Sequence, residues 1–227
     1  MSQPLADHVA RSVTIRAREA TLAGDLTVPA GANGIVLFAH GSGSSRASPR
    51  NVWVAARLAR AGLATLLFDL LTRTEEQRDL YTREHRFDIP LLARRLVDAT
   101  DWVDTQPELA GLPVGYFGAS TGAAAALVAA VERSGRVSAV VSRGGRPDLA
   151  SADVLARVAA PTLLVVGGND DVVLELNQLA LAAIRCAKRL DVVPGATHLF
   201  EEPGTLEQVA TLAAEWLVEY LVVQSGR

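Results

Sequence analysis

The pentapeptide Gly118-Ala119-Ser120-Thr121-Gly122 sets a serine between a strand-like segment and a helix-forming one. Residues 113–117 before it are short and apolar, and residues 123–130 after it are strong helix formers. Glycine has no Cβ, so the flanking glycines let Ser120 occupy a strained turn with its hydroxyl exposed. The pattern predicts a nucleophilic serine at a sharp strand-to-helix turn. A Gly- and Ser-rich turn without chemistry is the alternative interpretation.

Strands alternate with helices along the rest of the chain. Two joined strands are predicted near the N-terminus, and buried strands follow, over residues 13–18, 20–28, 34–40, 63–70, 113–117, 137–141, 161–166 and 190–193. Helices are predicted over 48–62, 90–105, from Thr121 onward, 174–184 and about 205–223, with a short one between 143 and 160. No element is predicted in the polar stretch 72–86. This order predicts one α/β domain, residues 1–227, with a mostly parallel sheet covered by helices on both faces.

The composition is that of an ordinary globular protein. Hydrophobic residues make up 49% of the 227 residues and charged ones 21%, with a net charge of −3. The basic residues are spread along the chain, so neither a nucleic-acid partner nor a membrane-binding face is expected. The single cysteine, Cys186, excludes a disulfide within the chain. The N-terminal residues show no signal-peptide core, so a cytoplasmic location is expected.

A serine nucleophile needs a base to take its proton and an acid to orient that base. In the chain order Ser, acid, His, both partners follow late strands. Among four histidines only His198 follows such a strand, so it is the predicted base. Asp170 and Asp171 compete to be the acid. Asp170 lies nearer the turn after its strand and is preferred, whereas Asp171 suits the first turn of the next helix.

An oxyanion hole is expected from two backbone N–H groups. One is that of Thr121, at the start of the helix after the nucleophile, and the other is that of Ser42 in the loop after the first buried strand. The small residues of this loop, 41–45, allow its backbone to approach a substrate. A phosphate cradle is the competing interpretation, but the loop lacks the terminal Gly-Lys-Ser/Thr of a P-loop.

With these motifs placed, nearly the whole chain resembles the α/β-hydrolases, in particular the dienelactone-hydrolase-like branch. It is also similar to a group of bacterial proteins, some of them fused to phosphoribosyltransferase domains. The first resemblance is carried by residues 118–122, 40–42, 167–170 and 195–198, and the similarity to the bacterial group by residues 41–46, 142–149 and 197–204. The resemblance implies Ser120 as nucleophile, Asp170 as acid and His198 as base. True dienelactone hydrolases carry cysteine at the nucleophile position, so the serine here implies a general carboxylic-ester hydrolase.

The resemblance also leads to predictions about the residues around the site. Many α/β-hydrolases insert a helical lid after the sixth strand, but residues 143–160 have room only for a loop and a short helix. No sizeable lid and an open site for small or exposed esters are therefore expected. The arginines near the site either bind an anionic substrate or form ion pairs that brace loops. Phe200 could line an acyl pocket. The tentative substrate-binding residues are therefore Arg46, Arg143, Arg146 and Phe200, with Arg50 nearby.

Two other functions stay open at this point. An acyltransferase would use the same three residues with an alcohol or thiol acceptor, and a non-catalytic binding protein could share the fold. No His, Cys and carboxylate cluster at metal-ligand spacing and no dinucleotide fingerprint is present, so no cofactor or metal is expected. The expected partner is a small-molecule ester, and the sequence leaves the oligomeric state open.

Overall fold

The computed structural model describes residues 10–222, and its strands form a single eight-stranded sheet in the order β1-β2-β4-β3-β5-β6-β7-β8. β1 and β2 pair antiparallel, β2 and β4 pair antiparallel, and every later pairing is parallel. The strands are β1 (Arg11–Arg16), β2 (Thr21–Thr27), β3 (Ile35–Ala39), β4 (Ala64–Phe68), β5 (Val114–Ala119), β6 (Val137–Arg143), β7 (Thr162–Gly167) and β8 (Lys188–Val193). The predicted α/β-hydrolase fold, with its mostly parallel sheet, is confirmed.

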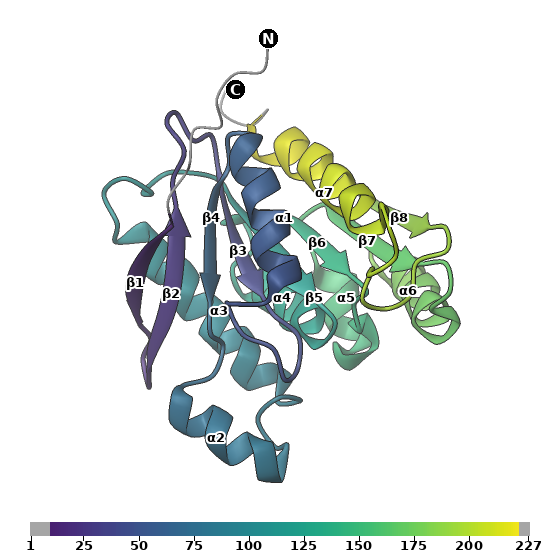
Figure 1. Cartoon of the computed structure of the whole chain (residues 1–227), viewed down its shortest axis with the longest axis horizontal. Coiled ribbons are helices and arrows are strands. Elements are labelled where there is room, and N and C mark those ends of the chain that lie inside the picture. Colours follow the sequence, from purple (N-terminus) through teal and green to yellow (C-terminus); the bar gives the residue numbers. More distant parts are fainter. Residues whose placement is uncertain (1–9, 223–227) are drawn as a thin grey trace.

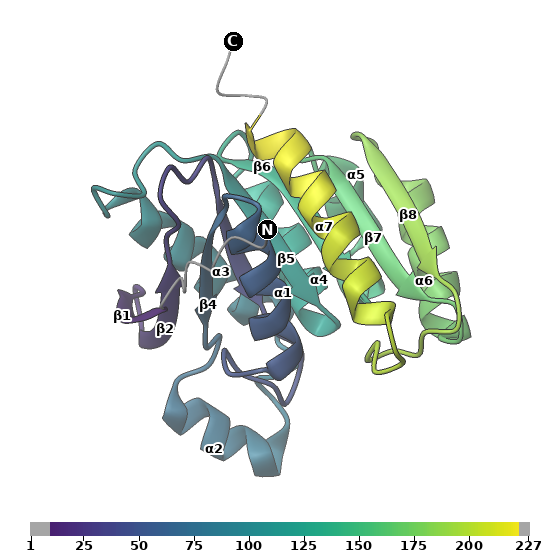
Figure 2. The ribbon, with the colours of Figure 1, turned by 45° about the horizontal axis from the view of Figure 1, so that its top comes forward.

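Helices cover both faces of this sheet (Figures 1 and 2). One face packs against α1 and α7, and the other packs against α3, α4, α5 and α6. The helices are α1 (Pro49–Arg60), α2 (Arg73–Thr82), α3 (Ile89–Asp104), α4 (Thr121–Glu132), α5 (Ala152–Arg157), α6 (Asp171–Ala183) and α7 (Thr205–Val222). No helix within residues 10–222 is long and apolar enough to cross a bilayer.

The central strands are continuous apolar runs because both of their faces are covered. Every residue of β3, β4 and β5 is buried, as expected of parallel strands between two helical layers. Helix α1 begins where the sequence predicts. The Ser48 side chain accepts a hydrogen bond from the Asn51 N–H, and Pro49 occupies the first helical position.

The prediction of no element over residues 72–86 was wrong, because α2 occupies part of this stretch. Its first turn is a capping box, in which Thr72 accepts from the Glu75 N–H and the Glu75 side chain accepts from the Thr72 N–H. Only Asp79 of this helix is buried, so an apolar stripe that would predict a helix is missing. α2 lies at the lower end of the molecule as drawn in Figures 1 and 2, beyond the end of β4.

The segment after β6 contains only short elements. A single 3₁₀ turn, η1 (Pro147–Leu149), is followed by α5 before the chain enters β7. This agrees with the expected loop and short helix and with the absence of a sizeable lid among the described residues. α2, which follows β4, lies instead near the segments that leave β3 and β4.

Candidate active site

Ser120 occupies a strained backbone conformation between β5 and α4. Its φ of 50° and ψ of −119° lie in a region that residues with side chains rarely adopt. Two backbone hydrogen bonds hold the turn: the Ser120 N–H donates to the Arg143 carbonyl at 3.2 Å, and the Ser120 carbonyl accepts from the Arg146 N–H at 3.0 Å. The end of β6 and the loop after it therefore fix the conformation of the predicted nucleophile.

The glycines on either side of Ser120 are required by close packing. A Cβ on Gly118 would lie 2.5 Å from the Ala123 Cα, and one on Gly122 would lie 2.1 Å from the Ala39 carbonyl oxygen. Neither contact is possible for a real side chain, because both neighbours are backbone atoms. Glycine at these two positions lets α4 start directly against the end of β3.

His198 and Asp170 lie in contact, although 28 positions separate them. His198 Nδ1 is 2.7 Å from Asp170 Oδ2. Asp170 follows β7 at the N-cap position of α6 but makes no side-chain cap bond, so its carboxylate is free to face the imidazole. Asp171 is exposed and is the first residue of α6, which agrees with its predicted position in the first turn of this helix. Gly144 lies against the imidazole, since a Cβ there would be 3.5 Å from His198 Nδ1.

One cavity brings Ser120 and His198 together. The described residues that line it include no carboxylate; they are Gly41, Ser42, Ser44, Ser48, Arg50, Asn51, Ala119, Ser120, Arg143, His198 and Leu199. We call it the serine cavity. Among residues 10–222 no hydrogen bond joins the Ser120 hydroxyl to His198. Catalytic hydrogen bonds of this kind often tighten only when a substrate is bound.

The loop after β3 passes close to Ser120. A Cβ on Gly41 would lie 3.2 Å from both the Ala119 carbonyl oxygen and the Ser120 Cβ. Ser42 lines the serine cavity, and Thr121 begins α4, where first-turn N–H groups have no acceptor within the helix. The two N–H groups expected to form an oxyanion hole thus belong to segments on either side of the nucleophile. Their catalytic role stays a prediction.

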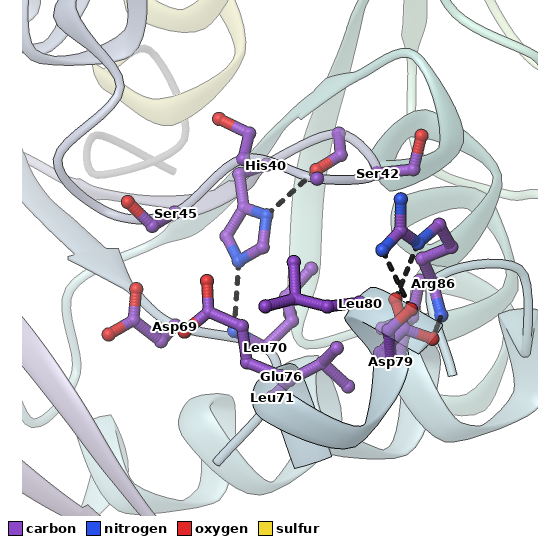
Figure 3. Close-up of a pocket in the computed structure, with 14 residues that line it drawn as sticks. His40, Ser42, Ser45, Asp69, Leu70, Leu71, Glu76, Asp79, Leu80 and Arg86 are labelled. Atoms are coloured by element: carbon purple, nitrogen blue, oxygen red, sulfur yellow. Dashed lines mark hydrogen bonds and ion pairs between the residues drawn. The ribbon is translucent and has the colours of Figure 1, made fainter. Parts of the chain in front are cut away.

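His40 anchors this loop as a neutral imidazole (Figure 3). Its Nε2 accepts a hydrogen bond from the Leu70 N–H at 3.1 Å, so the proton is on Nδ1, which donates to the Gly41 carbonyl at 3.0 Å. Burial lowers the pKa of His40 below its usual value, mainly through desolvation. The neutral ring therefore connects the loop at Gly41 to the end of β4.

A second cavity lies on the other side of the same loop, between the loop and α2 (Figure 3). Leucines from several elements form its apolar part, and three carboxylates face it with one guanidinium, that of Arg86, which is bonded to Asp79. We call it the α2 cavity. Its lining residues are His40, Gly41, Ser42, Gly43, Ser44, Ser45, Asp69, Leu70, Leu71, Glu76, Asp79, Leu80, Arg86 and Leu92. Gly41, Ser42 and Ser44 line both cavities and form a common wall between them, whereas Gly43 lines only the α2 cavity.

The tentative substrate-binding residues lie in different surroundings. Arg46 is paired with Asp25 and Asp69, and Arg146 is paired with Asp148, so these two brace loops and line neither cavity. Phe200 is buried and does not line the serine cavity, but its ring lies 5.9 Å from the Arg143 guanidinium. Only Arg143 of the four lines the cavity that holds Ser120.

The structure also assigns a supporting position to Asn177, which the sequence pattern does not single out. Its buried side-chain amide donates to the Gly145 carbonyl at 2.9 Å and to the Val173 carbonyl at 2.7 Å. It therefore ties α6 to the loop that bonds the Ser120 backbone. An asparagine in the middle of a predicted helix gave no signal of this contact. Within residues 10–222 no group of three His, Cys, Asp or Glu side chains could hold a metal ion.

Comparison with known proteins identifies a family to which this chain is similar. The model of the Dienelactone hydrolase family matches residues 20–220. A solved dienelactone hydrolase from Anabaena variabilis is 60% identical, with a TM-score of 0.91 over 93% of this chain and 98% of that chain. Est1E from Butyrivibrio proteoclasticus is 16% identical, with a TM-score of 0.77 over 92% of this chain and 98% of that chain, and shares the fold.

A curated relative from Mycobacterium tuberculosis carries the name "Putative phosphoribosyl transferase". It is 62% identical over 96% of this chain, but the match covers only 47% of that protein. The chain therefore spans about half the length of these curated relatives. Their name therefore describes proteins about twice as long as this chain.

Proposed function

Because the chain belongs to the dienelactone hydrolase family, we propose that it is a serine hydrolase that cleaves carboxylic esters through an acyl-enzyme on Ser120. The observation that carries this proposal is the contact of 2.7 Å between Asp170 and His198 beside the cavity that also contains Ser120. The strained φ of 50° at Ser120 supports it further, because such strain is concentrated at functional sites. The phosphoribosyl transferase name of the longer relatives is not transferred to this chain.

In the first half of the reaction Ser120 Oγ attacks the ester carbonyl carbon while its proton passes to His198 Nε2. Asp170 accepts the hydrogen bond of the His198 Nδ1–H, which keeps Nε2 free as the base and stabilises the imidazolium that forms. The N–H groups of Thr121 and Ser42 stabilise the negative oxygen of the tetrahedral intermediate. Collapse of this intermediate breaks the ester C–O bond, and His198 gives its proton to the departing alcohol.

The second half repeats these steps with water. His198 Nε2 takes a proton from a water molecule as the water oxygen attacks the acyl carbon. The acyl–Oγ bond then breaks, the carboxylic acid leaves, and the proton on His198 returns to Ser120 Oγ. With only a short helix between β6 and β7, the site suits small or exposed esters and lactones.

The test of this proposal is labelling and turnover by the purified chain. We expect a fluorophosphonate probe to modify the peptide that contains Ser120, and p-nitrophenyl esters from acetate to octanoate to be hydrolysed, with short acyl chains preferred. Ser120→Ala should lose both properties and keep its melting temperature. Ser44→Ala is the matched control, because this serine also lines the serine cavity and should leave labelling intact.

Two results would contradict the proposal. Labelling that survives Ser120→Ala would mean that another residue is the nucleophile. Labelling of Ser120 without hydrolysis of any ester, but with acyl transfer to an added alcohol or thiol, would favour the acyltransferase instead.

A further inference from the structure

Arg143 carries a guanidinium that is buried without a partner charge. The residue is 7% exposed, and within residues 10–222 its Nε has no hydrogen-bond partner and its side chain forms no ion pair. Burial, with the nearby Arg50 as a second cause, lowers the pKa of Arg143 to about 10, so the group remains charged at neutral pH. An unpaired buried cation costs free energy of folding, so a ligand that supplies the counter-charge is the natural explanation of its retention.

The surroundings of Arg143 supply further donors. Arg50, near the start of α1, lines the same cavity and pairs with Glu201 through Nη1 at 3.0 Å, while its buried Nε has no partner within the described residues. Ser44 and Ser48 add hydroxyl groups to the lining. Asn51 Oδ1 is a buried acceptor that has no partner among the described residues. Two guanidinium groups and several donors thus lie within one cavity, and none of the described residues that line it carries a carboxylate.

The α2 cavity has the opposite charge. It is lined by Asp69, Glu76 and Asp79, and its one guanidinium is neutralised by Asp79 (Figure 3). An anionic group next to Ser120 is therefore attracted to the Arg143 side of the loop and repelled from the α2 side. The charge distribution therefore favours an anionic group in the serine cavity over the α2 cavity.

We propose that Arg143 and Arg50 form a subsite for a phosphate monoester group, so that the ester cleaved at Ser120 carries a phosphate on the part of the molecule that lies in the serine cavity. A phosphate has about two negative charges near neutral pH and three terminal oxygens, which matches two guanidinium groups with free N–H donors better than a singly charged carboxylate does. This inference rests on the proposed ester hydrolysis for its substrate, but the subsite itself can be tested without turnover.

The binding test uses isothermal calorimetry on the purified chain with phenyl phosphate, benzoate and neutral benzamide. We expect phenyl phosphate to bind most tightly and benzamide least. Arg143→Gln and Arg50→Gln should each weaken phenyl phosphate binding about tenfold or more, as expected for loss of a charge-assisted hydrogen bond. Arg146→Gln is the matched control, because its guanidinium lies on the same loop but is paired with Asp148, and it should bind as the unmodified chain does.

The turnover test compares 4-acetoxyphenyl phosphate with 4-acetoxyanisole, which has the same acetyl ester and no charge. The unmodified chain should hydrolyse the phosphate-bearing ester with at least a tenfold higher kcat/KM, mainly through a lower KM. Arg143→Gln should lose this preference, measured as the ratio of the two kcat/KM values within the same variant. Arg143→Lys should recover part of it, since it restores the charge but not the planar fork.

The outcomes separate this subsite from the proposed reaction. Phenyl phosphate binding that depends on Arg143, with no hydrolysis of either ester, would support the subsite and contradict the ester hydrolase. Equal hydrolysis of both esters, unaffected by Arg143→Gln, would overturn the subsite and leave the hydrolase standing. Benzoate bound more tightly than phenyl phosphate, or binding indifferent to both substitutions, would also overturn it.

Discussion

The Arg143 carbonyl accepts the backbone hydrogen bond of Ser120 at 3.2 Å, while the Arg143 side chain lines the cavity into which Ser120 faces. One residue therefore holds the predicted nucleophile through its backbone and presents a buried cation through its side chain. Because the two roles use different atoms, a side-chain substitution at position 143 can remove the charge and leave the strained turn in place.

Arg143→Met should raise the stability of the protein. The substitution removes an unpaired buried charge and keeps most of the side-chain volume, and such changes are often stabilising by about 1–4 kcal/mol. For a chain of this size we expect an increase of at least about 2–4 °C in Tm, measured by thermal unfolding. Arg146→Met, which breaks an ion pair at the surface, should change Tm little. A clear decrease for Arg143→Met would mean that the Phe200 ring or another group stabilises the guanidinium in the free protein.

Asp170→Asn and Asp171→Asn should separate the two neighbouring carboxylates. Asparagine at 170 keeps the size but loses the charge that fixes the His198 tautomer, so kcat should fall by orders of magnitude, on the order of 10⁴ as in a serine protease triad. Asp171 lies in the first turn of α6, and its substitution should leave most of the activity and cost at most about 1 kcal/mol. Steady-state kinetics and Tm values of both variants make the comparison, and the reverse pattern would assign the acid to Asp171.

The buried His40 should make the protein less stable at acidic pH. Its pKa is lowered in the folded state, so below the unfolded value of about 6.5 the unfolded chain binds a proton that the folded chain does not. The free energy of unfolding is therefore expected to fall as the pH drops below about 6.5 and to be constant in this respect above it. Urea unfolding between pH 5 and 8 measures the effect, and His40→Gln should show a shallower dependence. The same slope in both proteins would assign the effect to other groups.

Gly41→Ala should reduce the rate more than the stability. Its Cβ would lie 3.2 Å from the Ala119 oxygen and the Ser120 Cβ, so the loop must move by a few tenths of an ångström away from the nucleophile. We expect kcat to fall by roughly tenfold or more, because donors to the developing oxyanion depend on position, while Tm changes little. Ser44→Ala in the same loop is the control. An unchanged kcat would mean that this loop supplies no oxyanion donor.

Activity should persist after exhaustive treatment with EDTA. The part of the chain that the structure describes, residues 10–222, holds no group of three metal-ligating side chains, and the proposed reaction needs only Ser120, His198 and Asp170. Ester hydrolysis before and after chelation, with Zn²⁺, Mn²⁺ and Mg²⁺ added back singly, measures this. A loss that one of these metals restores would require ligands that lie outside the described residues or are recruited by the substrate.

The sheet and the contact between His198 and Asp170 could be predicted because both depend on strand order. Each of the predicted residues Ser120, Asp170 and His198 follows a parallel strand, and the carboxyl ends of parallel strands meet at one edge of a sheet. A continuous apolar run is enough to find such strands, so their approximate positions follow from the sequence alone.

Helix α2 and the surroundings of the arginines could not be predicted in this way. α2 has no apolar stripe. Its start is stabilised by the Thr72–Glu75 capping box and by an ion pair between Arg95 and Glu75. Of these two features only the capping box can be recognised in the sequence, because the ion pair joins distant residues. Whether an arginine is paired depends on tertiary contacts. Arg46 pairs with Asp25 from a distant strand, whereas Arg143 pairs with no carboxylate among residues 10–222. Nothing in the two local sequences distinguishes these outcomes.

The loop that separates the two cavities limits how the specificity of this protein can change during evolution. Because Ser42 and Ser44 border both cavities, a substitution at either serine alters both cavities at the same time. A substitution at Leu80 in α2 or at Arg50 in α1 reaches only one of them. A change that is confined to one cavity is therefore expected to arise in α2 or α1, with the loop between them retained.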